Sequence, residues 1–425
     1  MNQITTSLIR RLDVDGVRRA VRPPVDDQTL DAARTIVNAV RQDGMPAVRR
    51  FAAQFGERRS DEAIVYGRDA MQAARDALGA DDCAVLERAA TRIKTFAIAQ
   101  RAAIQSLSMN VPGGQAGHDV VPVTAAGCYA PAGRYPLPSS VLMTAMTARA
   151  AGCERVVVAS PGANPVMLAA ASIAGADEFI AVGGAHAIAM LAYGTDEFDR
   201  VDVIAGPGNR WVTAAKQLVS GIVGIDMLAG PSELLVIADE TASADVVAAD
   251  LLAQAEHDVD AVPMLITTSS DLANEVDAAL VDQLESLPTA DVATAALGNG
   301  FICVVRDEDS MVALADQVAA EHLEVQTRTA DSTARRIRNA GALFIGTDTA
   351  EVLGDYGAGP NHTLPTGGSA RFQAGLSVMH FLRLRTWISM SDPPAARELI
   401  ADTERIARME GLEGHARSAG RRAVR

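Results

Sequence analysis

Residues 155–182 read RVVVASPGANPVMLAAASIAGADEFIAV, and this stretch decides the fold class. An apolar β-branched run at 156–159 is followed by an alanine-rich helical segment at 165–175 and by a second apolar run at 178–182. Fully apolar strands that alternate with helices are typical of a parallel sheet that is covered on both faces. The stretch therefore predicts a doubly wound α/β fold.

The same alternation continues along the chain. A helical segment at 185–193 and an apolar run at 201–205 extend the first series, and further strand-like runs follow at 233–237, 263–267, 302–305 and 342–345. Helical periodicity marks both flanks, at 30–40, 45–55, 84–100 and 394–419, while residues 112–119 form a glycine-rich and polar break. The pattern predicts two Rossmann-like doubly wound parallel-sheet domains with helical N- and C-terminal arms.

The composition narrows the possible partners. The 425 residues include 53 acidic and 38 basic side chains, a formal net charge of −15, which argues against a nucleic-acid partner. Four widely spaced cysteines form no Cys-x-x-Cys pair, which favours a reducing compartment and argues against a thiolate metal site. No apolar run is long enough to span a bilayer and no signal-peptide pattern is present, so we expect a cytoplasmic protein with no membrane association.

Two short polar pairs are candidates for chemistry. Gln254 and His257 are three residues apart on a predicted helix, so both side chains share one face, as metal ligands or an acid–base pair require. A helix end with a capping histidine would show the same pair. Glu321 and His322 close a predicted helix at 311–323, and a carboxylate beside an imidazole can move protons near neutral pH. Taken alone, this pair would more often lie on the surface.

Glycine-rich segments supply further candidates. A predicted loop at 354–362, GDYGAGPNH, carries Asp355 and His362. The turns at 183–184 and 206–209 each lie between a strand and a helix, where free amide groups favour an anion, and a tight βα turn explains both equally well. Tyr129 either stacks on a ring or packs in the core.

Several long strings, in this order, resemble one family. They are GPGNRWVTAAKQLVSG at 206–221, IDMLAGPSELLVIAD at 225–239, LLAQAEH at 251–257, AAEHLE at 319–324, GPNHTLPTGGSAR at 359–371, GLSV at 375–378 and a final Gly-x-x-x-His that ends at residue 415. In these strings the chain resembles the histidinol dehydrogenases, and the resemblance extends from the first helices to His415. Membership of a family does not by itself settle the substrate.

The resemblance implies a zinc site. The family binds one zinc through Gln, His, Asp and His, and the matching positions are Gln254, His257, Asp355 and His415. This set of nitrogen and oxygen ligands suits zinc. The residues implied to contact the substrate are these four together with Ser232, His322 and Glu410.

The resemblance also implies the chemistry. His322 would take the alcohol proton as hydride leaves for NAD, and Glu321 would then activate water so that the aldehyde is oxidised to the acid with a second NAD. The implied cofactor contacts are Tyr129, His186 and Asn209, on a Rossmann-like domain that lacks the full Gly-x-Gly-x-x-Gly fingerprint.

The family consists of intertwined homodimers in which the C-terminal tail completes the partner's active site. Glu410 and His415 would therefore act on the second copy of the chain. The implied domains are an N-terminal arm at 1–22, a discontinuous first Rossmann-like domain at 23–128 and 236–377, an NAD-binding second domain at 129–235, and a C-terminal helical arm at 378–425.

Four positions depart from the family pattern. His186 stands where most members have Gln, Ala132 replaces a glycine, Arg134 follows in the same loop, and His380 replaces an acidic residue. Arg134 either receives an anionic substrate group or lies on the surface.

We expect oxidation of L-histidinol to L-histidine in histidine biosynthesis. The alternative is a family paralogue that oxidises another polar or anionic alcohol, such as a sulfonated diol. A metallohydrolase would need an open metal position and no NAD, and a silent binding paralogue would have lost a ligand or the base. Neither fits the complete residue set.

Overall fold

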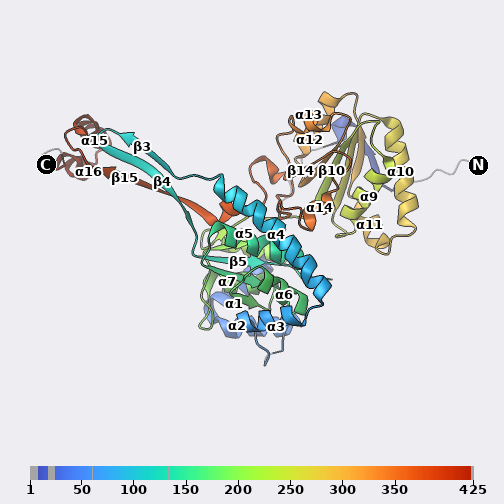
Figure 1. Ribbon diagram of the computed structural model, residues 1–425, viewed down its shortest axis with the longest axis horizontal. Coiled ribbons are helices and arrows are strands. Elements are labelled where there is room, and N and C mark those ends of the chain that lie inside the picture. The colour runs from blue at the N-terminus through green and yellow to red at the C-terminus, as the bar shows by residue number, and fades with distance from the viewer. Residues whose placement is uncertain (1–7, 18–23, 60, 133–134, 423–425) are drawn as a thin grey trace, which may run out of the picture.

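The computed structural model describes residues 8–17, 24–59, 61–132 and 135–422. Two six-stranded sheets form the body of the molecule, and a three-stranded sheet forms an arm that extends away from both (Figure 1). The α/β class and the two largely parallel sheets confirm the fold predicted from the sequence.

The first sheet has the strand order β2-β7-β6-β5-β8-β9. Its strands are β2 (Val65–Gly67), β7 (Glu178–Ile180), β6 (Arg155–Ala159), β5 (Ala125–Tyr129), β8 (Val203–Ala205) and β9 (Gly224–Ile225). All neighbours are parallel except β2 and β7. Alternate residues of β6 point into two different apolar clusters, Val156 and Val158 into one and Val157 and Ala159 into the other, so the sheet is buried on both faces.

Helices cover both faces of this sheet. One face packs on α3 (Arg68–Ala77), α4 (Ala80–Ala102), α5 (Pro138–Ala151) and α6 (Pro165–Ile173). The other packs on α1 (Asp27–Asp43), α2 (Met45–Gln54), α7 (Gly184–Tyr193) and α8 (Arg210–Val219). The helices expected at 30–40, 45–55, 84–100, 165–175 and 185–193 are all present within a few residues.

The second sheet is parallel throughout, with the order β1-β12-β11-β10-β13-β14. Its strands are β1 (Arg10–Leu12), β12 (Phe301–Val304), β11 (Val262–Thr267), β10 (Glu233–Ala238), β13 (His322–Gln326) and β14 (Ala342–Ile345). The covering helices are α9 (Ala244–Ala255), α10 (Ser270–Leu284) and α11 (Ala290–Leu297) on one face, and α12 (Glu308–Val318) with α13 (Ala330–Ala334) on the other. The short helix α14 (Glu351–Asp355) follows β14.

The arm is built from β3 (Leu107–Val111), β4 (Gly114–Pro122) and β15 (Leu382–Met390), which are antiparallel in the order β15-β4-β3. It carries α15 (Arg397–Met409) and α16 (Glu413–Gly420) at its outer end, beside the C-terminus (Figure 1). Gly113 turns the β3–β4 hairpin with φ +79°, and a Cβ there would lie 2.5 Å from the Cβ of Ala396. Glycine therefore permits both the turn and the close approach of the segment before α15.

Three sequence-based boundaries are wrong. Residues 112–119 are the turn and the first part of the second strand of the hairpin, not an irregular break. The C-terminal region expected at 378–425 begins with a 3-10 helix (Val378–Phe381) and the strand β15, and its α-helices follow. The helix expected at 311–323 ends at Val318, because Ala319 adopts the left-handed conformation (φ 54°) that stops a helix. Glu321 and His322 therefore lie at the start of a strand.

The sheets also divide the chain differently from the domains that we expected. Residues 23–128 supply α1 to α4 and the strands β2 and β5 to the first sheet, so they join 129–225 rather than 236–377. The strand β10 begins at Glu233 and belongs to the second sheet. Within the expected N-terminal arm, Arg10–Leu12 is an edge strand of the second sheet, and Ile9 is buried beside it. Across the described residues, no helix is long and apolar enough to cross a membrane.

Candidate active site

The predicted catalytic pair lies at the amino edge of the second sheet. Glu321 directly precedes β13, and Ser232 and Glu233 stand at the start of the neighbouring strand β10. In a doubly wound fold each helix runs back across the sheet from the carboxyl end of its strand. The ends of α9 and α14 therefore reach this same edge, which brings Gln254 and Asp355 toward His322.

Hydrogen bonding fixes the role of each ring nitrogen of His322. Nδ1 lies 3.1 Å from the main-chain oxygen of Glu233, and a carbonyl can only accept, so Nδ1 carries the proton. Nε2 is buried and has no hydrogen-bond partner among the described residues; the nearest acidic atom, Oε1 of Glu351, is 3.6 Å away. Burial lowers the pKa of His322 to about 4, so the ring is neutral near pH 7. Nε2 is thus an unprotonated base.

Glu321 is held beside this ring by the same residue. Its Oε2 accepts a hydrogen bond of 2.9 Å from the main-chain N–H of Glu233 and lies 3.7 Å from Nδ1 of His322. Burial raises the pKa of Glu321 well above its usual value. A carboxylate with a raised pKa is a stronger base when ionised, which suits the activation of water.

Three of the predicted metal ligands come from the second-sheet body. His257 Nε2 lies 3.9 Å from Asp355 Oδ2, and the main-chain oxygen of Asp355 is 3.0 Å from Nδ1 of His362. Gln254, in the last turn of α9, is fully buried, and neither atom of its side-chain amide has a hydrogen-bond partner in the described structure. Buried amides are almost always paired, so this pair of free atoms indicates a missing ligand.

The two predicted residues of the C-terminal region lie elsewhere. His415 in α16 and Glu410, which directly follows α15, are exposed at the outer end of the arm, far from the amino edge of the second sheet (Figure 1). The chain does not bring them to its own His257 and Asp355.

Sequence reasoning missed Glu351. Its side chain is 2% exposed, both carboxyl oxygens lack hydrogen-bond partners among the described residues, and burial raises its pKa to about 9. One ligand atom from each of Glu351, His322 and Asp355 lies within 4.8 Å of the others, a grouping that could hold a metal ion. Glu351 and Asp355 are four residues apart on α14, a spacing that places both side chains on one face of a helix. This spacing could have identified Glu351, but Asp355 was assigned to a loop at 354–362.

The predicted cofactor residues lie at the carboxyl edge of the first sheet. Tyr129 ends β5 and is 2% exposed, and its hydroxyl accepts a hydrogen bond of 3.2 Å from the N–H of Gly184. His186 is fully buried in α7. Asn209 caps α8 by accepting hydrogen bonds from the N–H groups of Trp211 and Val212, and only this third side chain is exposed.

The departures from the family pattern are spread out. Nδ1 of His380 accepts a hydrogen bond from the N–H of Ser377 in a short 3-10 helix. Ala132 pairs with Pro136 in an isolated bridge, and Arg134 lies outside the described residues.

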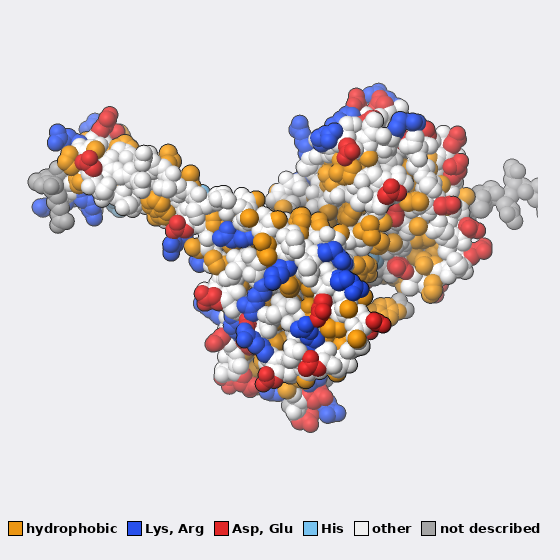
Figure 2. Space-filling view, viewed as in Figure 1, with side chains coloured by type: hydrophobic (Ala, Val, Ile, Leu, Met, Phe, Trp, Pro, Cys, Tyr) orange, Lys and Arg blue, Asp and Glu red, His pale blue; other side chains and the backbone are white. Residues whose placement is uncertain are grey.

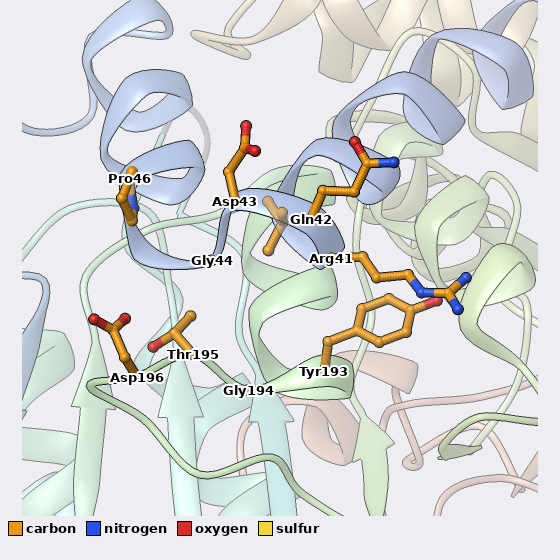
Figure 3. A pocket seen from close by; sticks show the side chains of 10 residues that line it. Arg41, Gln42, Asp43, Gly44, Pro46, Tyr193, Gly194, Thr195 and Asp196 are labelled. Carbon is orange, nitrogen blue, oxygen red and sulfur yellow. The ribbon is translucent and has the colours of Figure 1, made fainter.

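An open surface pocket lies between the end of α1 and the turn after α7 (Figure 3). It is lined by residues such as Arg41 and Tyr193 and by no predicted site residue.

Comparison with known proteins shows the family of the chain. The family model for histidinol dehydrogenase matches residues 21–423. The chain is 44% identical to the histidinol dehydrogenase of Thermus thermophilus over 395 residues, which cover 92% of this chain and 94% of the relative. It is 45% identical to that of Nitratidesulfovibrio vulgaris over 418 residues, with 96% and 95% covered. The chain belongs to the histidinol dehydrogenase family.

A solved histidinol dehydrogenase shares the fold. The crystal structure from Elizabethkingia anophelis superposes with a TM-score of 0.90 at 30% identity and covers 98% of each chain. Membership of the histidinol dehydrogenase family confirms that the chain is an enzyme, an NAD-dependent oxidoreductase. The roles of individual residues in the histidinol dehydrogenase site stay predictions.

Proposed function

We propose that this enzyme oxidises L-histidinol to L-histidine in two successive steps, as part of histidine biosynthesis. The observation that carries the proposal is the buried pair at the start of β13: a neutral His322 with a free Nε2, next to Glu321. The first oxidation requires a base for the alcohol proton, and the second requires a base for water.

Zinc fits the donor groups that the second-sheet body supplies. Gln254, His257 and Asp355 offer amide, imidazole and carboxylate ligands. The buried amide of Gln254 has no hydrogen-bond partner in the described structure, as expected for a metal ligand whose metal is absent. His415 from a second copy of the chain completes the set. When bound, zinc supplies a Lewis acid that anchors and orients the substrate, and NAD accepts the hydride of each oxidation.

Two residues of this chain, His322 and Glu321, accept the protons that the reaction releases. Nε2 of His322 accepts the hydroxyl proton of the alcohol as hydride leaves the same carbon, which gives the aldehyde. Glu321 accepts a proton from the water that adds to the aldehyde, and His322 takes the proton of the resulting hydrate in the second oxidation. The Glu233 main chain bonds to both side chains and holds them in register.

The arm supports a homodimer. Figure 2 shows hydrophobic side chains on the surface of the arm. The exposed large apolar residues of the arm are Leu107, Met109, Leu384, Ile388, Met390, Ile406 and Met409. Exposed apolar surface of this extent is typical of an interface. A second copy that covers it would bring its Glu410 and His415 to this chain's site.

The substrate is tested with the purified zinc-loaded enzyme. Incubation with L-histidinol and NAD is expected to yield about two NADH per histidine, because each oxidation transfers one hydride. A panel with other amino alcohols and with sulfonated diols tests the alternative, which the Arg134–Tyr135 departure favours. Turnover of an anionic alcohol without turnover of histidinol would contradict the proposal and support the alternative.

We also propose a cytoplasmic location for this enzyme. Its four cysteines are all free thiols, which agrees with a reducing compartment.

A further inference from the structure

Glu57 joins the predicted cofactor site from a segment that the sequence did not connect to it. It follows α2, and its Oε2 lies 3.0 Å from both the N–H of Gly183 and Nε2 of His186. The carboxylate can only accept, so Nε2 of His186 carries the proton. One carboxylate oxygen thus accepts hydrogen bonds from the Gly183 N–H and the His186 ring at the N-terminal end of α7.

This contact continues to Tyr129. Gly183 is followed by Gly184, whose N–H donates to the Tyr129 hydroxyl, so Glu57, the 183–184 turn and the end of β5 form one hydrogen-bonded group. The turn has no spare room, because a Cβ on Gly183 would lie 2.3 Å from Cγ of Pro161. Its position is therefore set by these contacts.

The burial of His186 argues against direct contact with the cofactor. Its side chain is 1% exposed, and its ring lies 5.7 Å from the ring of Phe55 and 6.3 Å from that of Phe51. The side chain faces the end of α2 rather than the open edge of the sheet. In doubly wound folds, ligands bind outside the carboxyl ends of the strands, where the 183–184 turn lies beside Tyr129.

We propose that Glu57 and His186 are positioning residues for the dinucleotide: they hold the 183–184 turn against Tyr129 and act through that turn. This inference rests on the proposed use of NAD at the first sheet. It assigns a function to Glu57 and replaces the direct contact that the family resemblance implies for His186. The loss of the Glu57 side chain leaves two buried donors, the N–H of Gly183 and Nε2 of His186, without their acceptor.

The test measures NAD affinity by calorimetry on the zinc-loaded enzyme. Glu57→Ala is expected to raise the Kd for NAD about tenfold, the loss that corresponds to one such hydrogen bond. The KM for NAD rises in parallel, while kcat at saturating NAD and the zinc content stay unchanged. Glu57→Gln keeps an oxygen that accepts both hydrogen bonds, so its Kd for NAD is expected to equal that of the wild type. If the negative charge were required instead, the Kd of Glu57→Gln would rise as in Glu57→Ala.

Glu197→Ala is the matched control. Glu197 pairs with Arg49 of α2 at 3.1 Å and so links the same helix to the segment beyond the other end of α7, with a half-exposed side chain. Its removal is expected to leave the Kd for NAD unchanged. If Glu57→Ala fails to fold, His186→Ala takes its place, with a smaller increase expected because Glu57 still binds Gly183.

The outcomes separate the two proposals. A wild-type Kd in Glu57→Ala, or in His186→Ala where the first variant does not fold, would overturn the positioning role alone. An equal weakening in Glu57→Gln would show that charge and not hydrogen bonding acts, and would overturn the positioning through hydrogen bonds. A wild-type enzyme that does not bind NAD would contradict the proposed function as well.

Discussion

The Nδ1 atom of His322 lies 3.1 Å from the main-chain oxygen of Glu233, and this contact assigns the proton on the ring. Nε2 is left as the basic nitrogen in a buried setting where the ring is neutral. His322→Ala is therefore expected to lower kcat for alcohol oxidation by about 10²–10⁴-fold. Steady-state rates and the Kd for histidinol check this.

His118→Ala is the control for that variant. His118 lies on β4 in the arm, where its Nε2 is 3.3 Å from the main-chain oxygen of Gln105. Its removal is expected to leave kcat unchanged. Full activity in His322→Ala would assign the base elsewhere.

Glu321→Gln separates the two oxidations. The amide keeps an oxygen that can accept the hydrogen bond from the N–H of Glu233, so the local geometry is preserved, but it cannot take a proton from water. We expect alcohol oxidation to continue and the conversion of added aldehyde to acid to fall by about 10²-fold or more. NADH yield per substrate, measured on alcohol and aldehyde separately, reports both steps. Equal loss in both steps would contradict the assigned role.

Metal content distinguishes two possible ligand groups. His257→Ala is expected to reduce the zinc bound per chain and to abolish activity, which added zinc restores only at high concentration. Glu351→Gln serves as the comparison, because Glu351 belongs to the grouping with His322 and Asp355 but not to the predicted ligand set. We expect it to retain about one zinc per chain. The opposite result would move the metal to Glu351.

Subunit mixing tests whether the arm acts on the partner. His415→Ala and His322→Ala are each expected to be inactive alone, since one lacks a ligand and the other the base. Unfolding and refolding them together at equal amounts is expected to restore about a quarter of wild-type activity, because half of the dimers are mixed and each mixed dimer has one intact site. No recovery would place His415 in the site of its own chain.

The pH dependence of stability is tested at Asp177. Burial opposes ionisation of this carboxyl, but hydrogen bonds from the Val156 N–H and from Arg68 and Arg149 outweigh it and lower its pKa below the usual 3.8. A lowered folded-state pKa adds stability that is present above the unfolded value and is lost as the pH falls below it. Asp177→Asn should lower Tm at pH 7 by roughly 2 °C.

The difference in Tm between wild type and Asp177→Asn should shrink as the pH falls from 5 toward 3. Asp31→Asn provides the control, because Asp31 pairs with Arg34 in an exposed i,i+3 contact that contributes little to stability. A constant difference across this pH range would show that Asp177 does not act through its charge.

Much of the fold could be predicted because its strands are buried on both faces. The runs at 156–159, 233–237 and 263–267 are almost wholly apolar, and each became a strand of a parallel sheet. β13 was mistaken for a helix end because it is buried and yet polar: His322, Glu324 and Gln326 are buried in the strand, and Glu321 is buried directly before it. A strand that supplies an active site loses the apolar pattern that would identify it.

The arm was misread for a different reason. β15 reads LRLRTWISM, and Leu384 and Ile388 recur on one face at even spacing, which is a strand signal that the helical periodicity around it obscured. Long-range contacts were equally hidden. Nothing in the sequence around Glu57 or Glu351 connects them to His186 or His322, because those pairs meet only when separate segments pack together.

Without zinc, the buried amide of Gln254 has a thermodynamic consequence. A buried polar group without a partner costs about 1–3 kcal/mol of folding free energy. An apolar residue of similar size, such as Met, at position 254 would therefore make the zinc-free protein more heat-resistant and leave the enzyme inactive. A screen for heat resistance alone would therefore select apolar substitutions at position 254 and lose the metal ligand. Thermal stability and activity favour different residues at the end of α9.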